Sequence, residues 1–245
     1  MSLLKKGYFM THDKTTVSKT VYLSLIVQFV TTAISLDGLN YNLQDKDKIL
    51  RTILILEAIV QGVEAFFYIW VIKALKKINI MSSRRYVDWF ITTPLMLFTT
   101  TIFMQYQKNK EEGKEEIITI PQFIEDNKEI LVLIFLFNYA MLFFGLMHEL
   151  KTINPKQGIS KNTALPIGFV CFFVSFFLIY DNFAKYTEYG RNLFYFLIIV
   201  WGLYGYSAYK PPIKKNTYYN CLGIVSKNFY GLFLYYYITQ IAERK

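Results

Sequence analysis

Seven largely apolar stretches follow one another along the chain, separated by shorter connections rich in polar and charged residues. A helix needs about 20 residues to cross the roughly 30 Å hydrocarbon layer of a bilayer, and each stretch reaches or approaches that length. The pattern predicts an all-α fold, a bundle of seven transmembrane helices with the two termini on opposite sides of the membrane. The predicted helices cover about residues 20–39, 49–74, 85–105, 129–150, 163–180, 191–209 and 216–241.

The connections are predicted to be polar loops that carry no chemistry. The longest, residues 107–127, is highly charged and contains Pro121, so we expect a solvated loop with a short strand or amphipathic piece near residues 117–120. His148 and Glu149 close the fourth apolar stretch. We expect them to lie at the membrane interface rather than in a functional site.

Composition supports a membrane protein and argues against several other classes. Hydrophobic residues make up 53% and aromatic residues 18% of the chain, which is too apolar for an ordinary soluble domain. The formal charge of +9 resides mostly in the connections, which indicates contact with anionic lipid headgroups and no nucleic-acid partner. Cys171 and Cys221 lie inside apolar stretches, so neither a disulfide framework nor a metal site is indicated. Residues 1–19 contain no apolar core for a cleavable signal, so the first helix is expected to direct insertion.

Charged residues inside two of the apolar stretches are the strongest functional signal. Arg85 and Asp88 share one helix face with Thr92 and Met96, because their spacing is i, i+3, i+7 and i+11. Ionisable side chains inside a membrane segment are costly and mark a functional site by default. Lys227 lies near the middle of the last stretch, too deep to reach either interface. Such a lysine is neutral, ion-paired, or bonded covalently as a Schiff base to a carbonyl ligand.

Two rows of polar residues mark one face of each of the first two helices. The first row is Ser24, Gln28, Thr31 and Ser35, and the second is Glu57, Gln61, Glu64 and Tyr68. An ionised carboxylate facing lipid costs about 2–4 kcal/mol or more, so the two glutamates must face the bundle interior or a water-filled path. Hydrogen bonding between helices would explain the rows without any ion path, so both interpretations stay open.

The sequence around Asp88 resembles the third helix of microbial (type 1) rhodopsins, which reads R-Y-x-D-W-x-x-T-x-P-L. The segment from Tyr219 and Asn220 through Lys227 to Gly231 is similar to the seventh helix of proteorhodopsins. Trp201-Gly202-Leu203-Tyr204 and residues 142–147 extend the similarity, which covers most of the chain. The resemblance implies a single retinal-binding domain over residues 1–245, with all-trans retinal covalently bound at Lys227. It implies that Asp88 is counterion and proton acceptor, held ionised by Arg85. The retinal pocket implied by the resemblance consists of Tyr86, Trp89, Thr92, Met96, Gly145, Trp201 and Tyr204.

Two positions depart from the proton pumps of this family. Thr99 stands where the pumps carry the carboxylate that returns a proton to the Schiff base, and Gly223 replaces a second aspartate near the lysine. We hypothesise that Glu64 takes the role of that second counterion. The paired glutamates of the second helix resemble those of channelrhodopsins, especially the light-gated cation channels among giant-virus rhodopsins. The predicted ion path follows Ser24, Gln28, Glu57, Gln61, Glu64 and Asn220.

The resemblance implies a light-driven membrane protein and no enzyme. We predict a light-gated cation channel with a polar path between the first, second and seventh helices. An outward proton pump and a sensory photoreceptor with a separate transducer remain alternatives. Lys and Arg outside the spans divide almost evenly between the two sides, so they do not set the orientation. The family implies an outer amino terminus, a cytoplasmic carboxyl terminus and a homo-oligomer. Met96, near the retinal ring, resembles the residue of green-absorbing forms.

Overall fold

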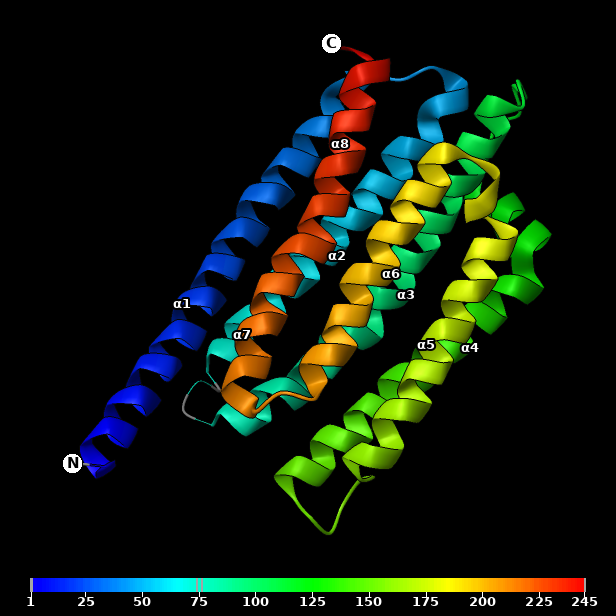
Figure 1. Cartoon of the computed structure of the whole chain (residues 1–245). Coiled ribbons are helices and arrows are strands. Elements are labelled where there is room, and N and C mark those ends of the chain that lie inside the picture. Colours follow the sequence, from blue (N-terminus) through cyan, green and yellow to red (C-terminus); the bar gives the residue numbers. More distant parts are fainter. Residues whose placement is uncertain (1, 74, 76, 245) are drawn as a thin grey trace.

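Seven helical crossings form a bundle in the computed structural model, which describes residues 2–73, 75 and 77–244 (Figure 1). Side chains are described for residues 14–73, 75, 77–78 and 80–242. The predicted all-α bundle of seven helices is confirmed. The first six crossings are α1 (Ser2–Asp37), α2 (Lys48–Ile72), α3 (Ile78–Glu111), α4 (Ile120–Ile153), α5 (Lys161–Asn182) and α6 (Glu188–Ala208). Short 3-10 turns occupy Gly38–Asn40, Asp45–Asp47 and Ala184–Tyr186.

The seventh crossing changes its winding in the middle. It consists of α7 (Pro212–Gly223), the π-helical segment η4 (Ile224–Asn228) and α8 (Phe229–Ile241). The crossing begins earlier than predicted because Pro212 occupies the first turn. N–H groups in the first turn have no hydrogen-bond partner within the helix, so proline loses nothing there. Single π-helical turns occur frequently at functional sites, and this one contains Lys227.

Several helices are longer than the apolar stretches, because many charged residues also favour helix beyond the membrane. α1 begins at Ser2 instead of near residue 20, and α3 continues to Glu111. α4 begins at Ile120, where the hydroxyl of Thr119 accepts a hydrogen bond from the amide of Gln122 at 3.4 Å. The loop predicted over residues 107–127 is therefore confined to residues 112–119, and the short strand predicted near 117–120 does not form. The strands within the described residues are β1 (Tyr41–Asn42) and β2 (Glu243–Arg244), which pair antiparallel.

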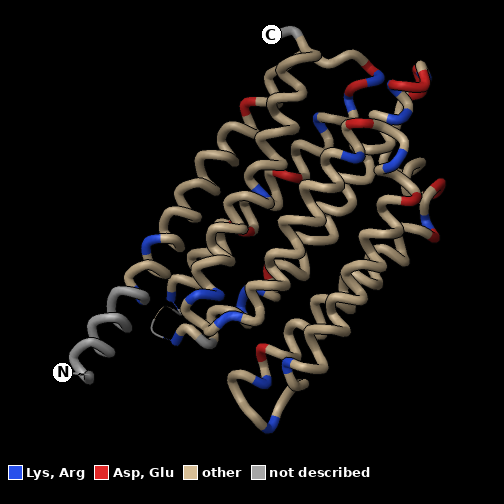
Figure 2. The backbone as a smooth tube through the Cα atoms, in the orientation of Figure 1, with Lys and Arg blue, Asp and Glu red and all other residues tan. Residues whose placement is uncertain are grey.

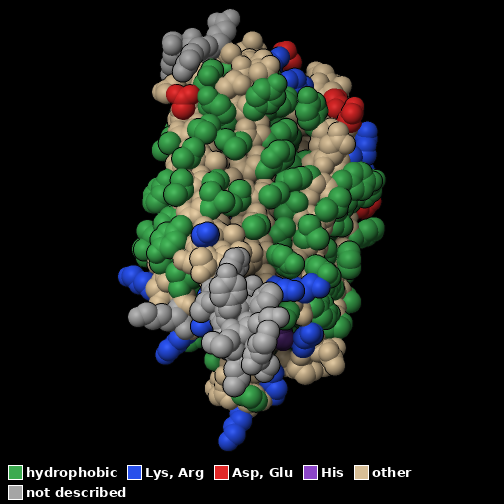
Figure 3. Space-filling model, turned by 60° about the vertical axis from the view of Figure 1, so that its left-hand side comes forward, with side chains coloured by type: hydrophobic (Ala, Val, Ile, Leu, Met, Phe, Trp, Pro, Cys, Tyr) green, Lys and Arg blue, Asp and Glu red, His purple; other side chains and the backbone are tan. Residues whose placement is uncertain are grey.

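The outside of the bundle is apolar along its length and charged at its ends. Large side chains such as Phe66 and Phe177 are 68% and 64% exposed. Figure 3 shows hydrophobic side chains covering the middle of one face, and Figure 2 shows most charged residues near the two ends. An apolar surface of this extent suits contact with lipid. Within the described residues, α1 to α5 are each long and apolar enough to cross a membrane, whereas η4 divides the seventh crossing into shorter helices. The chain is an integral multi-pass membrane protein.

The helices are arranged as a closed ring. Each packs on its neighbours in the chain, and α7 closes the ring by packing on α1. This closure brings the polar faces of α1 and α2 next to the seventh crossing. We call the lower end of the bundle in Figure 1, where α3 and α7 begin, the Arg85 end, and the upper end the Thr99 end.

Candidate functional site

Lys227 is buried between two carboxylates that come from different helices. Its Nζ lies 2.8 Å from Oδ2 of Asp88 on α3 and 3.4 Å from Oε1 of Glu64 on α2. The lysine is only 2% exposed, so the carboxylates stabilise its charge in place of water. Both distances suit a positively charged nitrogen at this position, whether a free ammonium or a protonated Schiff base.

Glu64 occupies space that a side chain at position 223 would need. A Cβ placed on Gly223 would stand 3.1 Å from Oε1 of Glu64 and 2.8 Å from the hydroxyl of Tyr68. The missing side chain on α7 therefore makes room for a carboxylate supplied by α2. This geometry is what the hypothesis of Glu64 as a second counterion requires.

Arg85 is buried near the lysine but contacts an amide. Its Nη2 donates a hydrogen bond to Oδ1 of Asn220, and its guanidinium lies 5.4 Å from the ring centroid of Tyr68. No ion pair within 4.0 Å joins Arg85 to Asp88 in the described part of the chain. Any action of Arg85 on Asp88 would therefore be a longer-range electrostatic one, without the direct contact that a salt bridge would give.

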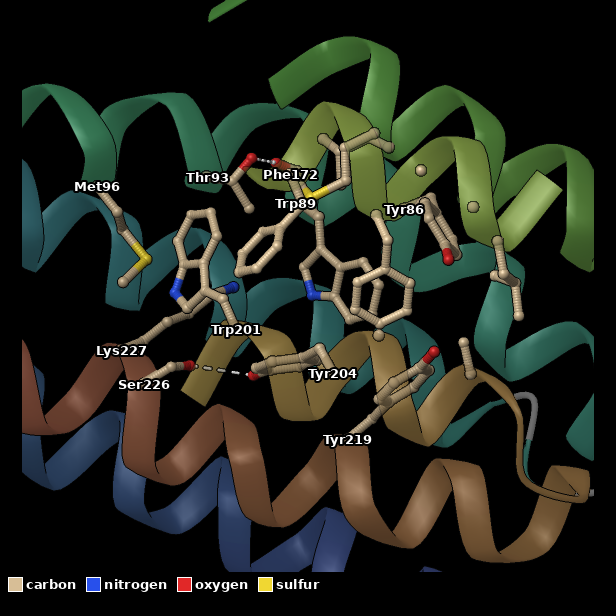
Figure 4. Close-up of a pocket in the computed structure, with 18 residues that line it drawn as sticks. Tyr86, Trp89, Thr93, Met96, Phe172, Trp201, Tyr204, Tyr219, Ser226 and Lys227 are labelled. Carbon is tan, nitrogen blue, oxygen red and sulfur yellow. Dashed lines mark hydrogen bonds between the residues drawn. The ribbon is translucent and has the colours of Figure 1, made fainter. Parts of the chain in front are cut away.

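An apolar cavity extends from Lys227 between α3, α4, α5 and α6 (Figure 4). Trp89 contributes one wall, with its ring centroid 5.3 Å from that of Tyr204 and 5.1 Å from that of Tyr219. A cavity with aromatic walls and a primary amine at one end suits a slender apolar molecule that carries an aldehyde. Six of the seven residues predicted for the pocket line this cavity: Tyr86, Trp89, Met96, Gly145, Trp201 and Tyr204.

Thr92 is the exception among the predicted pocket residues. Its hydroxyl donates to the backbone carbonyl of Asp88 at 3.1 Å, and it does not line the cavity. Its neighbour Thr93 does line the cavity and accepts a hydrogen bond from Nδ2 of Asn138 at 2.9 Å. Adjacent residues on a helix point about 100° apart, so Thr92 and Thr93 face different sides of α3, and the role of Thr92 stays a prediction.

Most of the remaining cavity residues carry no signal in the sequence. α5 is apolar around its whole circumference, and such a helix does not reveal which face points inward. Besides Thr93, the lining residues that the sequence analysis did not assign to the pocket are Met141, Leu142, Leu165, Gly168, Phe169, Phe172, Gly205, Ala208, Tyr219 and Ser226.

The polar rows of α1 and α2 face each other and the seventh crossing, as the predicted ion path requires. Gln28 donates to Glu64, Ser24 donates to the carbonyl of Asn220 at 3.1 Å, and Ser35 donates to Gln61 at 3.3 Å. All of these side chains are buried, as are Glu57, Thr31 and Asn228. We call this set the polar file; its members are Ser24, Gln28, Thr31, Ser35, Glu57, Gln61, Glu64, Asn220 and Asn228.

Several buried atoms of the polar file have no hydrogen-bond partner among the described residues. They are Oε1 of Gln28, Oε2 of Glu57 and Nε2 of Gln61. Buried polar atoms are nearly always paired in folded proteins, with water where protein partners are lacking. We therefore expect water beside these three atoms.

Glu57 lies beside Thr99, at the position that lacks the proton-returning carboxylate. The hydroxyl of Thr99 donates a hydrogen bond to Oε1 of Glu57. A carboxyl group is thus present at this level of the bundle, but α2 supplies it in place of α3. The motif on α3 alone could not reveal this substitution.

Glu149 and His148, which we expected at the membrane interface, lie inside the bundle at its Arg85 end. Both are buried, and both carboxylate oxygens of Glu149 accept a hydrogen bond from Nζ of Lys215 at 2.7 Å. The partner, Lys215, lies at the start of α7, and the sequence around residue 149 does not predict this contact.

Comparisons of the sequence and of the fold with known proteins identify the family of this chain. The sequence model of the bacteriorhodopsin-like protein family matches residues 17–241. The viral rhodopsin OLPVRII is similar with a TM-score of 0.76 and 24% identity, over 92% of this chain and 98% of that chain. Exiguobacterium sibiricum rhodopsin gives a TM-score of 0.72 and 16% identity, over 94% and 98%. The blue light-absorbing proteorhodopsin from Med12 gives 0.68 and 15%, over 91% and 97%. A comparison with curated protein sequences gave no match. At these identities, the solved structures establish the fold alone.

Proposed function

Because the chain belongs to the bacteriorhodopsin-like family, we propose that it is a light-gated cation channel whose chromophore, all-trans retinal, is bound to Nζ of Lys227. Retinal binding and light-driven ion transport or light sensing come with the family. The choice of a channel and the roles of individual residues are our proposal.

The cavity residues fit retinal and would hold it in one orientation. Trp89 and Trp201 present flat aromatic surfaces to an apolar chain that ends at Lys227. When bound, retinal supplies the absorption of visible light and a change of shape after it. Asp88 and Glu64 would balance the positive charge on Nζ in a site where water cannot.

Asp88 is placed to take the proton of Nζ. Its Oδ2 is the nearer of the two carboxylate groups, at 2.8 Å, which is within hydrogen-bond reach for proton transfer. Transfer to Asp88 removes the positive charge from Nζ of Lys227, which lies next to Glu64 in the polar file. The same transfer neutralises the Asp88 carboxylate, so the net charge of the site is unchanged, but a cation beside Glu64 then no longer meets a positive charge on Nζ.

The polar file is the observation that carries the channel proposal. It runs past Lys227 from Asn220 at the Arg85 end to Glu57 beside Thr99, and it contains buried atoms with unused hydrogen-bonding capacity. Its oxygen atoms and two carboxylates favour cations over anions. A proton pump needs an alternating proton route and has less use for a long row of buried hydroxyls and amides.

Voltage clamp of illuminated cells separates the candidate functions. We expect a photocurrent that changes direction as the membrane voltage passes the equilibrium potential of the permeant cation. A current of fixed direction that persists against the gradient would identify a pump. If no current flows at any voltage, the sensory photoreceptor is the remaining candidate function.

An outward proton pump is the second candidate, and one contact favours it. Glu57 places a carboxyl group on the hydroxyl of Thr99, so α2 could return the proton that α3 cannot. In a pump of this kind, Glu57→Gln would slow recovery of the pigment after a flash while leaving the first proton transfer to Asp88 intact. Flash spectroscopy beside the electrical recording tests this, and unchanged recovery removes the argument for a pump.

The colour of the pigment is predicted from Met96. This residue is buried and lines the cavity, and an apolar side chain there resembles the green-absorbing forms of the family. We expect purified protein reconstituted with all-trans retinal to absorb maximally in the green. A maximum in the blue would contradict the role assigned to Met96.

We further propose an outer amino terminus, a cytoplasmic carboxyl terminus and a homo-oligomer in contact with anionic lipid. The support is the family pattern together with the basic connections. Antibody access to a tag at each terminus of intact cells tests the orientation. A mass measurement in detergent tests the oligomer, and a monomer mass would contradict it.

A further inference from the structure

A second buried ion pair lies outside the proposed mechanism. Glu149 on α4 and Lys215 on α7 are 1% and 3% exposed, and Nζ of Lys215 is 2.7 Å from both carboxylate oxygens. A buried ion pair gains little net stability, because the loss of hydration offsets the attraction. Loss of one partner alone is strongly unfavourable, because the other charge is left buried without compensation. Such a pair therefore favours arrangements of the helices in which its two charged side chains remain in contact.

The pair joins two helices that pack mainly on other elements. α4 packs chiefly on α5 and α3, whereas α7 packs chiefly on α1, α6 and α3. In Figure 1, α3 and α6 lie between them over most of their length. Contact between Glu149 and Lys215 therefore spans the bundle at the Arg85 end.

The pair also stands just beyond one end of the cavity. Glu149 follows Gly145 by one helical turn, and Lys215 precedes Tyr219 by one turn; Gly145 and Tyr219 both line the cavity. Figure 4 places Tyr219 and Tyr86 at the opposite end of the cavity from Lys227. A Cβ on Gly145 would touch the hydroxyl of Tyr86, so α4 approaches closely there.

We propose that Glu149 and Lys215 form a latch that holds α4 on α7 and keeps this end of the cavity closed to water and small polar molecules. The latch rests on the retinal pocket proposed above, but the contact belongs to the chain itself. If α4 and α7 separated, each charge would recruit water about one helical turn from Tyr219. The latch therefore positions the end wall of the pocket and takes no part in proton transfer.

Two measurements test the latch, the first without retinal. Spin labels at exposed Thr152 and Lys214, in a protein whose Cys171 and Cys221 are replaced by alanine, report the distance between α4 and α7 by double electron–electron resonance. The second is the rate at which hydroxylamine bleaches the pigment in the dark. Glu149→Gln and Lys215→Met should broaden the distance distribution and speed bleaching by about tenfold. The exchange variant Glu149→Lys with Lys215→Glu should restore both.

Controls keep the test decisive. Asp181→Asn removes an exposed ion pair with Lys185 and should change neither readout. If the single variants do not fold, Glu149→Met with Lys215→Met is compared with the exchange variant, and the methionine pair is expected to be the open one. A methionine pair as closed as the parent, or single variants that lower the melting temperature without changing either readout, would overturn the latch. A colourless preparation would count against the retinal proposal and leave the spin-label distances to decide the latch.

Discussion

Replacing Lys227 by alanine is expected to give a protein that stays colourless with all-trans retinal. Lys227 is the amine at the end of the apolar cavity, and without it no covalent bond can form there. The change also leaves Asp88 and Glu64 without their cation, and breaking a buried ion pair in this way costs about 3–5 kcal/mol. Absorption spectra of the purified protein after incubation with retinal measure the outcome.

Two companions separate loss of the bond from loss of the fold. Lys227→Arg keeps a positive charge between the carboxylates but cannot form the bond, so it should also be colourless while unfolding at a higher temperature than the alanine variant. Lys185→Ala removes an exposed lysine and should give full colour. Pigment formed by Lys227→Ala would show that the chromophore is bound elsewhere.

Glu64→Gln is expected to change both the colour of the pigment and the photocurrent. Its carboxylate lies 3.4 Å from Nζ of Lys227, so removing its charge destabilises the ground state of the positively charged chromophore and moves absorption to longer wavelength. The same change removes a negative charge from the polar file, which should lower cation conductance. Absorption spectroscopy and voltage clamp on the same variant measure the two effects.

Glu57→Gln is the matched control, because it changes the same residue type two turns away on the same helix. Glu57 bonds to Thr99 and has no contact with Lys227 within 4.0 Å in the described residues, so we expect altered conductance with an unchanged spectrum. If both variants conduct like the parent, the polar file has a structural role only. If Glu64→Gln leaves the spectrum unchanged, Glu64 is not a counterion.

The fold follows from the sequence because the bilayer imposes a length and a polarity on every crossing. The hydrophobic pattern does not predict where a helix ends outside the membrane. Charged residues such as Glu111 propagate helix almost as well as apolar ones, so hydropathy marks the membrane boundary and misses the helix boundary. The widened turn at Ile224–Asn228 likewise has no local signature.

The centre of the site follows from the sequence because its charges are conspicuous. Asp88 and Lys227 stand inside apolar runs, and their proximity in the structure agrees with the pairing that the sequence suggests. The sequence predicts which face of the second helix carries Glu64. Its position beside Lys227, however, depends on the space left by Gly223 on another helix.

The surroundings of other residues cannot be predicted from the sequence, because only tertiary contacts decide them. Glu149 stands at the end of an apolar stretch, where a charge ordinarily marks the interface, and its buried partner Lys215 belongs to a distant helix. Thr92 and Thr93 are adjacent, and only the placement of α4 decides that Thr93 faces the cavity.

The reversal potential of the photocurrent tests cation conduction through the polar file most directly. With pH equal on both sides and Na⁺ as the main permeant cation, we expect it to shift by about 59 mV for each tenfold change in external Na⁺. A photocurrent that flows in one direction at every voltage, whatever the Na⁺ gradient, would contradict the channel.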